Sequence, residues 1–351
     1  MEACMDFLDR LGVDLSSKIL MNLEDPSDIV RVSSVSRSWR HFVIANGFCQ
    51  QLCLRMFPQL SRVSGVIELN KCAQIEPAVG SSYSVELETL EKDHRVYTFL
   101  ARGCRSSHVY GCIQRAICAS STDSYPGKRV ENTLSACRAF YWSSKGQSNP
   151  AMPEALTYEL VSKFCIITEI NICPFQAYFQ SGSPIYSAKS VRFRLGYSKT
   201  STDDVGKGRL AYSYPSADDK FIWTYTSQEF PMAQKSDIQK FKLPEPVLCV
   251  GGILQIELLG RVQRNKADGL FYICMTYVQV VGRSLSPAFG VENLEPSGKF
   301  ILLHNKLEKF YDQPNDPVES AAHIVRSSAG DLWQIVNRLQ GNLVDPIDGF
   351  E

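Results

Sequence analysis

The sequence has no excess charge of either sign and no hydrophobic run long enough to cross a membrane. Its 351 residues include 37 lysines and arginines and 37 aspartates and glutamates, so the formal net charge at pH 7 is zero. A balanced chain lacks the basic surface that drives non-specific binding to nucleic acid or to an anionic membrane. No apolar stretch reaches the roughly 18 residues of a membrane-spanning helix. We therefore expect no nucleic acid and no membrane among the partners.

Signals of the secretory pathway are also missing. The N-terminal segment MEACMDFLDR lacks the basic region and long apolar core of a secretory signal, and the chain holds no Asn-x-Ser/Thr glycosylation acceptor. These absences predict a protein of the nucleus, the cytoplasm or both. Because cytosolic reductants keep thiols reduced, we expect the 12 cysteines to be free and mostly buried as small hydrophobic side chains.

Common motifs of catalysis and metal binding are absent as well. The sequence has no G-x-S-x-G nucleophile elbow, no Walker loop and no H-E-x-x-H zinc motif. Cys49, Cys53 and His41 lie close in the sequence but lack the paired spacing of a zinc site. The segment GKGRLA, residues 206–211, imitates a dinucleotide fingerprint but has no strand before it and no helix after it. We expect no cofactor, no metal and no enzyme activity.

What the sequence does contain begins with a series of short helices before residue 60. Asp25 and Pro26 form a helix start, because the carboxylate can cap the first turn and proline fits the first helical position. Ser36 can cap a further helix that carries Trp39. Amphipathic segments flank this pair on both sides, so the region is expected to form about four short helices.

From about residue 112 the pattern changes to that of β-strands. Segments such as KSVRFRLGYS and FYICMTYVQVVG are rich in β-branched and aromatic residues and alternate with Gly, Pro, Ser or Asp turns. Alternating apolar positions give each strand one inward face. No useful helical segment separates the strands, which favours an antiparallel sandwich over a doubly wound α/β sheet. Near the C-terminus, GDLWQIVNRLQG has the spacing of an amphipathic helix.

The helical start resembles an F-box, the short module that docks on the adaptor Skp1. The resemblance rests on residues in the order and spacing of that module: Leu11, Ile19, Leu20, Leu23, Asp25, Pro26, Asp28, Ile29, Val32, Val35, Arg37, Trp39 and Arg40. Gly12 and Ser36 depart from the usual proline and cysteine, and Gly12 should loosen entry to the first helix. The resemblance implies that Skp1 binds an apolar face formed by Leu11, Ile19, Leu20, Leu23, Ile29 and Val32. From the pattern alone, these residues could equally form the core of an ordinary helical domain.

The β half is similar to a galactose-binding or discoidin-like jelly roll. The segments ASSTDSYP, YWSS, ALTYEL, AKSVRFRLGYS and the terminal VQVVG carry this resemblance. Sandwich domains present ligands at loop tips, and sugar sites often combine an aromatic face with polar groups. The candidate substrate-binding residues are therefore Tyr125, Trp142, Asp203, Asp204, Tyr212 and Tyr214. Trp142 has a second interpretation, as a structural residue of the sandwich.

Together these patterns predict an α+β multidomain chain. We expect an F-box at residues 7–57, a connector with a helix at 58–111, an antiparallel β-sandwich (jelly roll) at 112–283, and a linker with an amphipathic helical tail at 284–351. The resemblance implies a substrate-recognition subunit of a Skp1-cullin-F-box ubiquitin ligase. Its F-box would bind a Skp1-like adaptor, and through it the cullin-RING ligase, while the sandwich binds a target protein or glycoprotein. The alternative is a lectin-like or scaffold protein that recruits Skp1 without a ligase.

Overall fold

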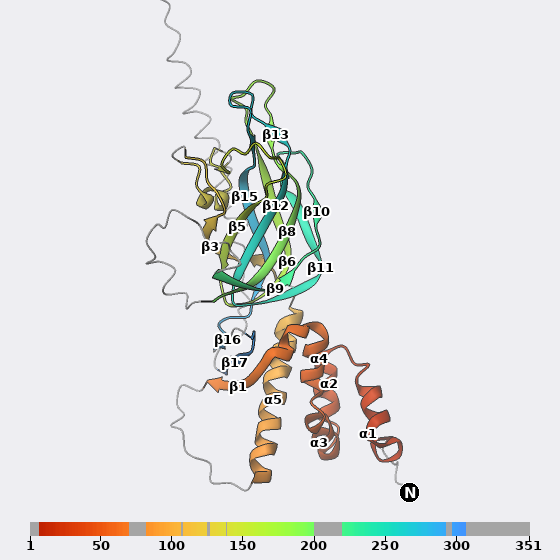
Figure 1. Ribbon diagram of the computed structural model, residues 1–351. Helices are drawn as coiled ribbons and strands as arrows, with labels where there is room; N and C mark the ends of the chain where they lie inside the picture. The colour runs from red at the N-terminus through yellow and green to blue at the C-terminus, as the bar shows by residue number, and fades with distance from the viewer. Residues whose placement is uncertain are drawn as a thin grey trace, which may run out of the picture.

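The chain folds into an N-terminal group of helices and a C-terminal β-sandwich (Figure 1). The computed structural model describes residues 7–69, 82–106, 108–124, 127–137, 139–199, 220–292 and 297–306. The helices are α1 (Phe7–Leu20), α2 (Pro26–Ser33), α3 (Arg37–Ala45), α4 (Phe48–Met56) and α5 (Ser82–Arg105), with short 3-10 turns at Pro58–Arg62 and Val130–Leu134.

The helix starts lie where the sequence places their caps. The Asp25 carboxylate accepts a hydrogen bond from the backbone N–H of Ser27 at 2.7 Å and so caps α2. The Ser36 hydroxyl accepts one from the backbone N–H of Trp39 at 3.2 Å and caps α3. Gly12 interrupts α1 with a φ of 69° and a ψ of 170°, a conformation that side-chain-bearing residues rarely adopt. The predicted caps at Asp25 and Ser36 are therefore confirmed, whereas Gly12, expected only to loosen entry to the first helix, interrupts α1.

Two antiparallel sheets form the sandwich. Its strands are β2 (Tyr110–Gly111), β3 (Ile113–Ala119), β4 (Trp142–Ser143), β5 (Glu154–Leu160), β6 (Phe164–Gln176), β7 (Ile185–Tyr186), β8 (Ala188–Ser198), β9 (Phe221–Thr226), β10 (Phe230–Pro231), β11 (Gln239–Val250), β12 (Ile253–Arg261), β13 (Gln263–Arg264), β14 (Phe271–Tyr272) and β15 (Cys274–Ser284). One sheet has the order β10-β8-β12-β5-β3 with β9 beside β8. The other has the order β11-β6-β15-β2, with β4 beside β15 and β7 beside β6, while β13 and β14 form a separate hairpin. The predicted antiparallel sandwich is confirmed.

A third, small sheet lies between the helices and the sandwich (Figure 1). It consists of β1 (Val63–Leu69), β16 (Phe289–Glu292) and β17 (Phe300–Asn305), and β17 pairs in parallel with β1 and antiparallel with β16. We expected a linker after residue 283, but the described part of this segment forms two strands instead. Their partner β1 lies far earlier in the chain, so no local pattern reveals the pairing. The predicted tail helix lies outside the described residues.

Two large hydrophobic cores stabilise the fold, together with a smaller cluster around Phe175 and Tyr186. The first fills the space between the two large sheets and includes Tyr158, Phe193 and Leu254. The second joins the helices to the lower end of the sandwich, where Leu52 of α4 and Leu100 of α5 belong to the same buried cluster as sandwich and small-sheet residues, among them Phe164, Leu248 and Phe300. Burying one such side chain contributes about 1.5–3 kcal/mol. The two halves therefore share a core, and the segment expected as a connector with a helix at residues 58–111 contributes to it through Leu60 and the buried face of α5.

Candidate functional site

The first helix exposes large apolar side chains to solvent. Leu11, Val13, Leu15 and Ile19 of α1 are 39, 60, 52 and 46% exposed, and we call these four residues the α1 patch. Leu15 and Ile19 are four residues apart and lie on the same side of the helix. Apolar residues gathered on one exposed element commonly mark an interface with another protein.

The structure divides the six residues predicted to bind Skp1 into three pairs. The surface pair is Leu11 and Ile19, the core pair is Leu20 and Ile29, and the half-buried pair is Leu23 and Val32. The core and half-buried pairs pack the helices together, and only the surface pair among these six is largely exposed. Sequence reasoning did not include Val13 and Leu15, because their exposure depends on how α1 lies against the other helices.

Contacts at both ends of α1 fix its position. Trp39 of α3 is buried and meets the Phe7 ring edge-to-face at 4.8 Å between centroids. The Arg55 guanidinium of α4 donates hydrogen bonds to the carbonyls of Met21 and Leu23 at 2.5 and 2.8 Å, just past the end of α1. The α1 patch therefore has a defined place on the surface of the molecule.

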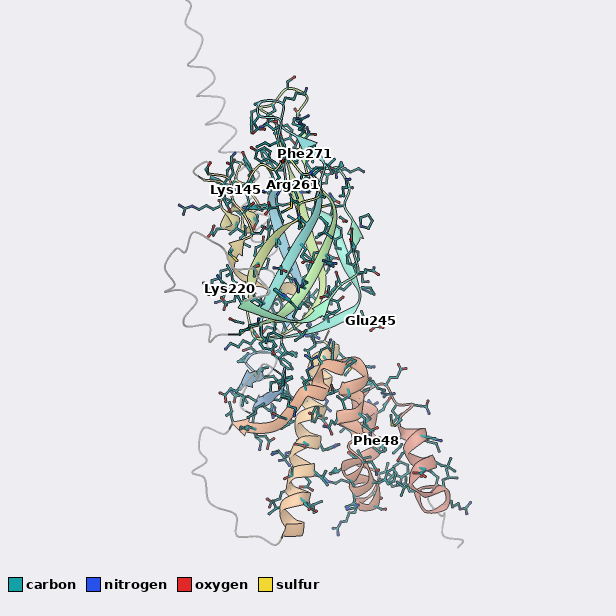
Figure 2. The ribbon with its side chains drawn as sticks, viewed as in Figure 1. Phe48, Lys145, Lys220, Glu245, Arg261 and Phe271 are labelled. Carbon is teal, nitrogen blue, oxygen red and sulfur yellow. The ribbon has the colours of Figure 1, made fainter. Side chains whose placement is uncertain are left out.

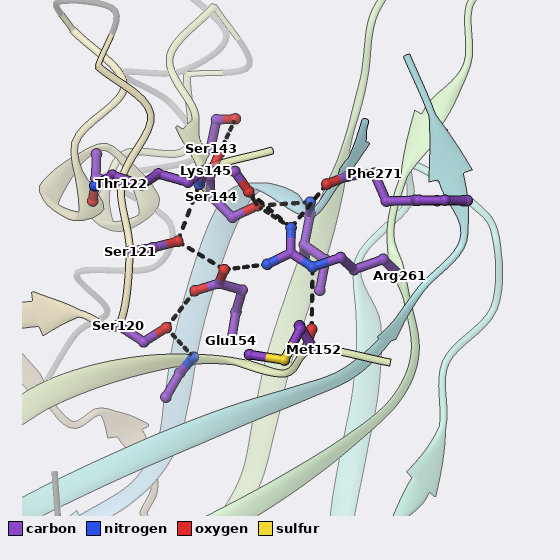
Figure 3. Close-up of polar contacts among 12 residues, drawn as sticks. Ser120, Ser121, Thr122, Ser143, Ser144, Lys145, Met152, Glu154, Arg261 and Phe271 are labelled. Carbon is purple, nitrogen blue, oxygen red and sulfur yellow. Dashed lines mark hydrogen bonds and ion pairs between the residues drawn. The ribbon is translucent and has the colours of Figure 1, made fainter. Parts of the chain in front are cut away.

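Inside the sandwich, a buried ion pair joins several loops (Figure 3). Arg261 and Glu154 pair with side chains that are 0 and 3% exposed. The Glu154 carboxylate also accepts hydrogen bonds from the hydroxyls of Ser120 and Ser121. Arg261 donates four further hydrogen bonds, to Ser144 Oγ, Lys145 O and Phe271 O at 2.9 Å and to Met152 O at 3.1 Å. With both charges paired and buried, the network positions loops and offers no group to a ligand.

A pocket of about 210 Å³ opens at the end of the sandwich that lies away from the helices, and we call it the far pocket. Figure 1 places the β13 hairpin at this end, and Figure 2 shows Phe271 there, opposite Phe48 of the helical part. Arg261 holds the hairpin through the Phe271 carbonyl. Polar, charged and aromatic residues from three separate chain segments line the pocket. Its aromatic residues are Tyr141, Phe175, Phe179, Tyr186 and Tyr272.

The aromatic rings of the far pocket are arranged in two pairs. Tyr141 and Phe175 stack with centroids 3.7 Å apart and planes 10° from parallel. Tyr186 and Tyr272 meet edge-to-face at 6.3 Å and 89°. Phe179 is 72% exposed, with its ring centroid 6.2 Å from that of Phe175. The pocket thus combines packed aromatic walls with one aromatic ring that is open to solvent.

Charged groups complete the far pocket. Lys128 Nζ lies 2.8 Å from a carboxylate oxygen of Asp123, and the two charges neutralise each other. Asp268 accepts hydrogen bonds from the Tyr272 hydroxyl at 2.6 Å and from the Leu270 N–H at 2.9 Å. Sequence reasoning missed this site, because its residues are scattered over the chain and several belong to segments that are expected to be strands.

The predicted substrate-binding residues do not gather in the described part of the sandwich. Trp142 is fully buried, and its indole N–H donates to the Ser121 carbonyl at 3.2 Å and to the Thr122 hydroxyl at 3.3 Å. It is therefore a structural residue, which was the second interpretation given above. The other five lie outside the described residues: Tyr125, Asp203, Asp204, Tyr212 and Tyr214.

Three further features bear on the function. Within the described ranges, no group of three or more His, Cys, Asp or Glu side chains is placed to hold a metal ion. None of the helices that the structure describes is long and apolar enough to cross a membrane. The described cysteines are free thiols, and most of them are buried.

Solved structures similar to the chain include two sandwich domains of low sequence identity. The family 32 carbohydrate-binding module from Clostridium perfringens NanJ, in complex with galactose, is 11% identical with a TM-score of 0.32 and aligns 48% of this chain with 98% of that one. The F5/8 type C domain of a Bacteroides fragilis protein is 13% identical with a TM-score of 0.30 and aligns 49% of this chain with 97% of that one. Scores this low support no conclusion, and the sandwich assignment rests on the observed strand pairing.

Sequence comparisons cover both the helical module and the whole chain. The F-box-like family model matches residues 8–55, which include α2, α3 and all but one residue each of α1 and α4. The F-box protein At4g00755 of Arabidopsis thaliana is 45% identical over 357 residues, covering 98% of this chain and 95% of that protein. An identity of this size over nearly the full length of both proteins includes the helical module and the sandwich together. The chain therefore belongs to the F-box protein family.

Proposed function

We propose that the chain is the substrate-recognition subunit of a Skp1-cullin-F-box ubiquitin ligase. The α1 patch binds a Skp1-like adaptor, and the sandwich binds the target. The observation that carries this proposal is the exposure of four large apolar side chains on one helix of an F-box-like module. Covering apolar surface contributes about 25 cal/mol per Å², so a partner that fits the patch gains affinity from each of these residues.

In this proposal the chain has no catalytic group of its own. Binding the target and the adaptor in one assembly raises the effective concentration of the acceptor lysine near the ubiquitin donor. The chain then needs two separate binding surfaces and a connection that holds them in one assembly. The α1 patch and the sandwich meet this requirement, because the buried cluster between helices and sandwich joins the two halves.

The substitution Ile19→Asp tests the adaptor surface. Ile19 is 46% exposed, so the free chain should tolerate the charge, whereas the adaptor would bury it without a partner. An unpaired buried carboxylate costs several kcal/mol. Because about 1.4 kcal/mol corresponds to a tenfold change in affinity, we expect at least roughly a hundredfold loss of affinity for the adaptor. Leu20→Asp is a poor test because Leu20 is only 5% exposed, and the charge would disrupt the helical core.

The measurement is co-purification after co-expression with a Skp1-like adaptor, followed by the affinity of the purified pair. Val161→Asp, at an exposed position between β5 and β6, is the matched control and should bind like the natural chain. Unchanged binding by Ile19→Asp would show that the adaptor docks elsewhere. Ubiquitination of a bound target in the reconstituted ligase then separates a receptor from a scaffold that only recruits the adaptor.

A further inference from the structure

We propose that the far pocket receives a basic side chain, lysine or arginine, of the target protein. This inference rests on the proposed function, because it assigns the part of the receptor that touches the target. Three observations carry it: five aromatic residues line the pocket, one carboxylate has no cationic partner in the described part of the chain, and the pocket lies away from the adaptor surface.

The aromatic walls suit a cation more than an ordinary apolar side chain. A guanidinium or ammonium group is attracted to the face of an aromatic ring within about 6 Å of its centroid. Tyr141 stacks on Phe175, and the Lys128 ammonium lies 5.7 Å from the Tyr141 ring centroid. The ring open to an incoming cation is therefore that of Phe179, which stands largely in solvent. An exposed phenylalanine at the rim of a pocket offers a ring face to an incoming side chain and allows its methylene groups to pack.

Among the charged side chains that the structure describes in the far pocket, the Asp268 carboxylate is left without a counter-charge. Asp123 and Lys128 form their own pair at 2.8 Å, so their charges cancel. No lysine, arginine or histidine of the described residues forms an ion pair with Asp268, which is exposed. Its slight burial opposes ionisation, but hydrogen bonds from Tyr272 and Leu270 outweigh this and hold the pKa of Asp268 below its ordinary value. The pocket therefore presents a negative charge at neutral pH.

This charge favours a cation over the other possible occupants. An anionic group would meet Asp268 directly, because the one ammonium lining the pocket already pairs with Asp123. A neutral ligand that covered the pocket would desolvate the carboxylate without supplying a counter-charge, which is unfavourable. A lysine or arginine supplies the counter-charge and also contacts the rings, and arginine can donate two hydrogen bonds to one carboxylate.

The position of the pocket fits a target-binding site. It lies at the end of the sandwich opposite the helical module, as the labels of Phe271 and Phe48 in Figure 2 show. A protein bound at the far pocket would leave the α1 patch free for the adaptor. The two partners could then occupy the chain together, which delivery of a target requires.

Saturation-transfer NMR on the full chain tests the proposal without a known target. The probes are N-acetyl arginine methylamide, N-acetyl lysine methylamide, the matching glutamine compound and methyl galactoside. We expect saturation of one or both basic probes and none of the glutamine probe. Asp268→Asn should weaken binding of the basic probes about fivefold, the scale of one partly exposed ion pair. Phe179→Ala should weaken it by a similar factor, and its exposure makes the substitution safe for the fold.

Glu245→Gln is the control, because Glu245 is an exposed acidic residue of β11 that Figure 2 places at the end of the sandwich nearer the helices. It should bind the basic probes like the natural chain. Absence of binding by both basic probes, equal binding after Asp268→Asn, or binding of methyl galactoside alone would overturn the proposal. Binding of the probes does not involve the adaptor. Co-purification of Asp268→Asn with the Skp1-like adaptor tests only the α1 patch, so failure of this proposal and failure of the proposed function can be distinguished.

Discussion

Replacing Arg261 with methionine should destabilise the sandwich by about 3–5 kcal/mol. Methionine keeps much of the length and apolar stem of arginine but removes the guanidinium. That group is fully buried and forms one ion pair and four further hydrogen bonds. Its loss leaves the Glu154 carboxylate buried, with two serine hydroxyls and no counter-charge. Breaking a buried pair by removing one partner costs about 3–5 kcal/mol, because the remaining charge is uncompensated.

Arg192→Met is the matched control for this substitution. Arg192 lies 2.6 Å from Glu257, but its side chain is 40% exposed, and such pairs contribute at most about 1 kcal/mol. Urea unfolding of the purified variants measures both losses through the midpoint and the slope. The double variant Glu154→Leu/Arg261→Met should recover much of the stability, because an apolar pair leaves no buried charge. Equal losses of stability for Arg261→Met and Arg192→Met would refute the reasoning, since burial would then have no effect on how much an ion pair contributes to stability.

Two further predictions concern the thiols and the shared core. Burial raises the pKa of the Cys249 and Cys274 thiols from 9.0 to about 12, so at pH 8 they should react with iodoacetamide about a thousandfold more slowly than an unperturbed thiol. Peptide mass mapping of the folded chain checks this, and rapid labelling of either cysteine would contradict it. A chain of residues 61–351 exposes the α5 residues that pack on α4, so we expect a lower urea midpoint and binding of a hydrophobic dye. A midpoint equal to that of the full chain would show that the sandwich needs no helices.

Features that depend on neighbouring residues could be predicted from the sequence. The caps at Asp25 and Ser36 are set by side chains within a few residues of each helix start. The inward faces of the strands follow from alternation, which is also local. The predicted helices before residue 60 and the antiparallel sandwich therefore match the structure.

Features that depend on distant residues could not be predicted in this way. The parallel pairing of β1 with β17 joins segments separated by most of the chain. The alternation of apolar residues within a strand this short does not indicate which other strand it pairs with. Leu20 and Ile19 are adjacent and similar in the sequence, yet packing buries the first and exposes the second. The far pocket likewise needs the fold, because Tyr141, Phe175 and Tyr272 approach one another only after the sheets pair.

The layer between the two halves determines how the proposed binding surfaces relate to each other. Glu68 of β1 forms ion pairs with Arg95 of α5 at 3.1 Å and with Lys306, just after β17, at 2.7 Å. Burial opposes ionisation of Glu68, but the hydrogen bonds from Lys306 and Arg95 outweigh it and lower its pKa. The carboxylate therefore stays charged at neutral pH and holds the small sheet against α5.

This contact lies beside the apolar cluster that α4, α5 and the sandwich share, so polar and apolar contacts both oppose a change in their relative orientation. A flexible linker would let a bound target sample many positions, whereas a packed layer restricts it to few. In the proposed ligase, the position of the target relative to the adaptor is therefore set by the fold itself. The affinity for the adaptor, the affinity for the target and the relative position of the two bound partners are then separate properties, because they depend on different residues.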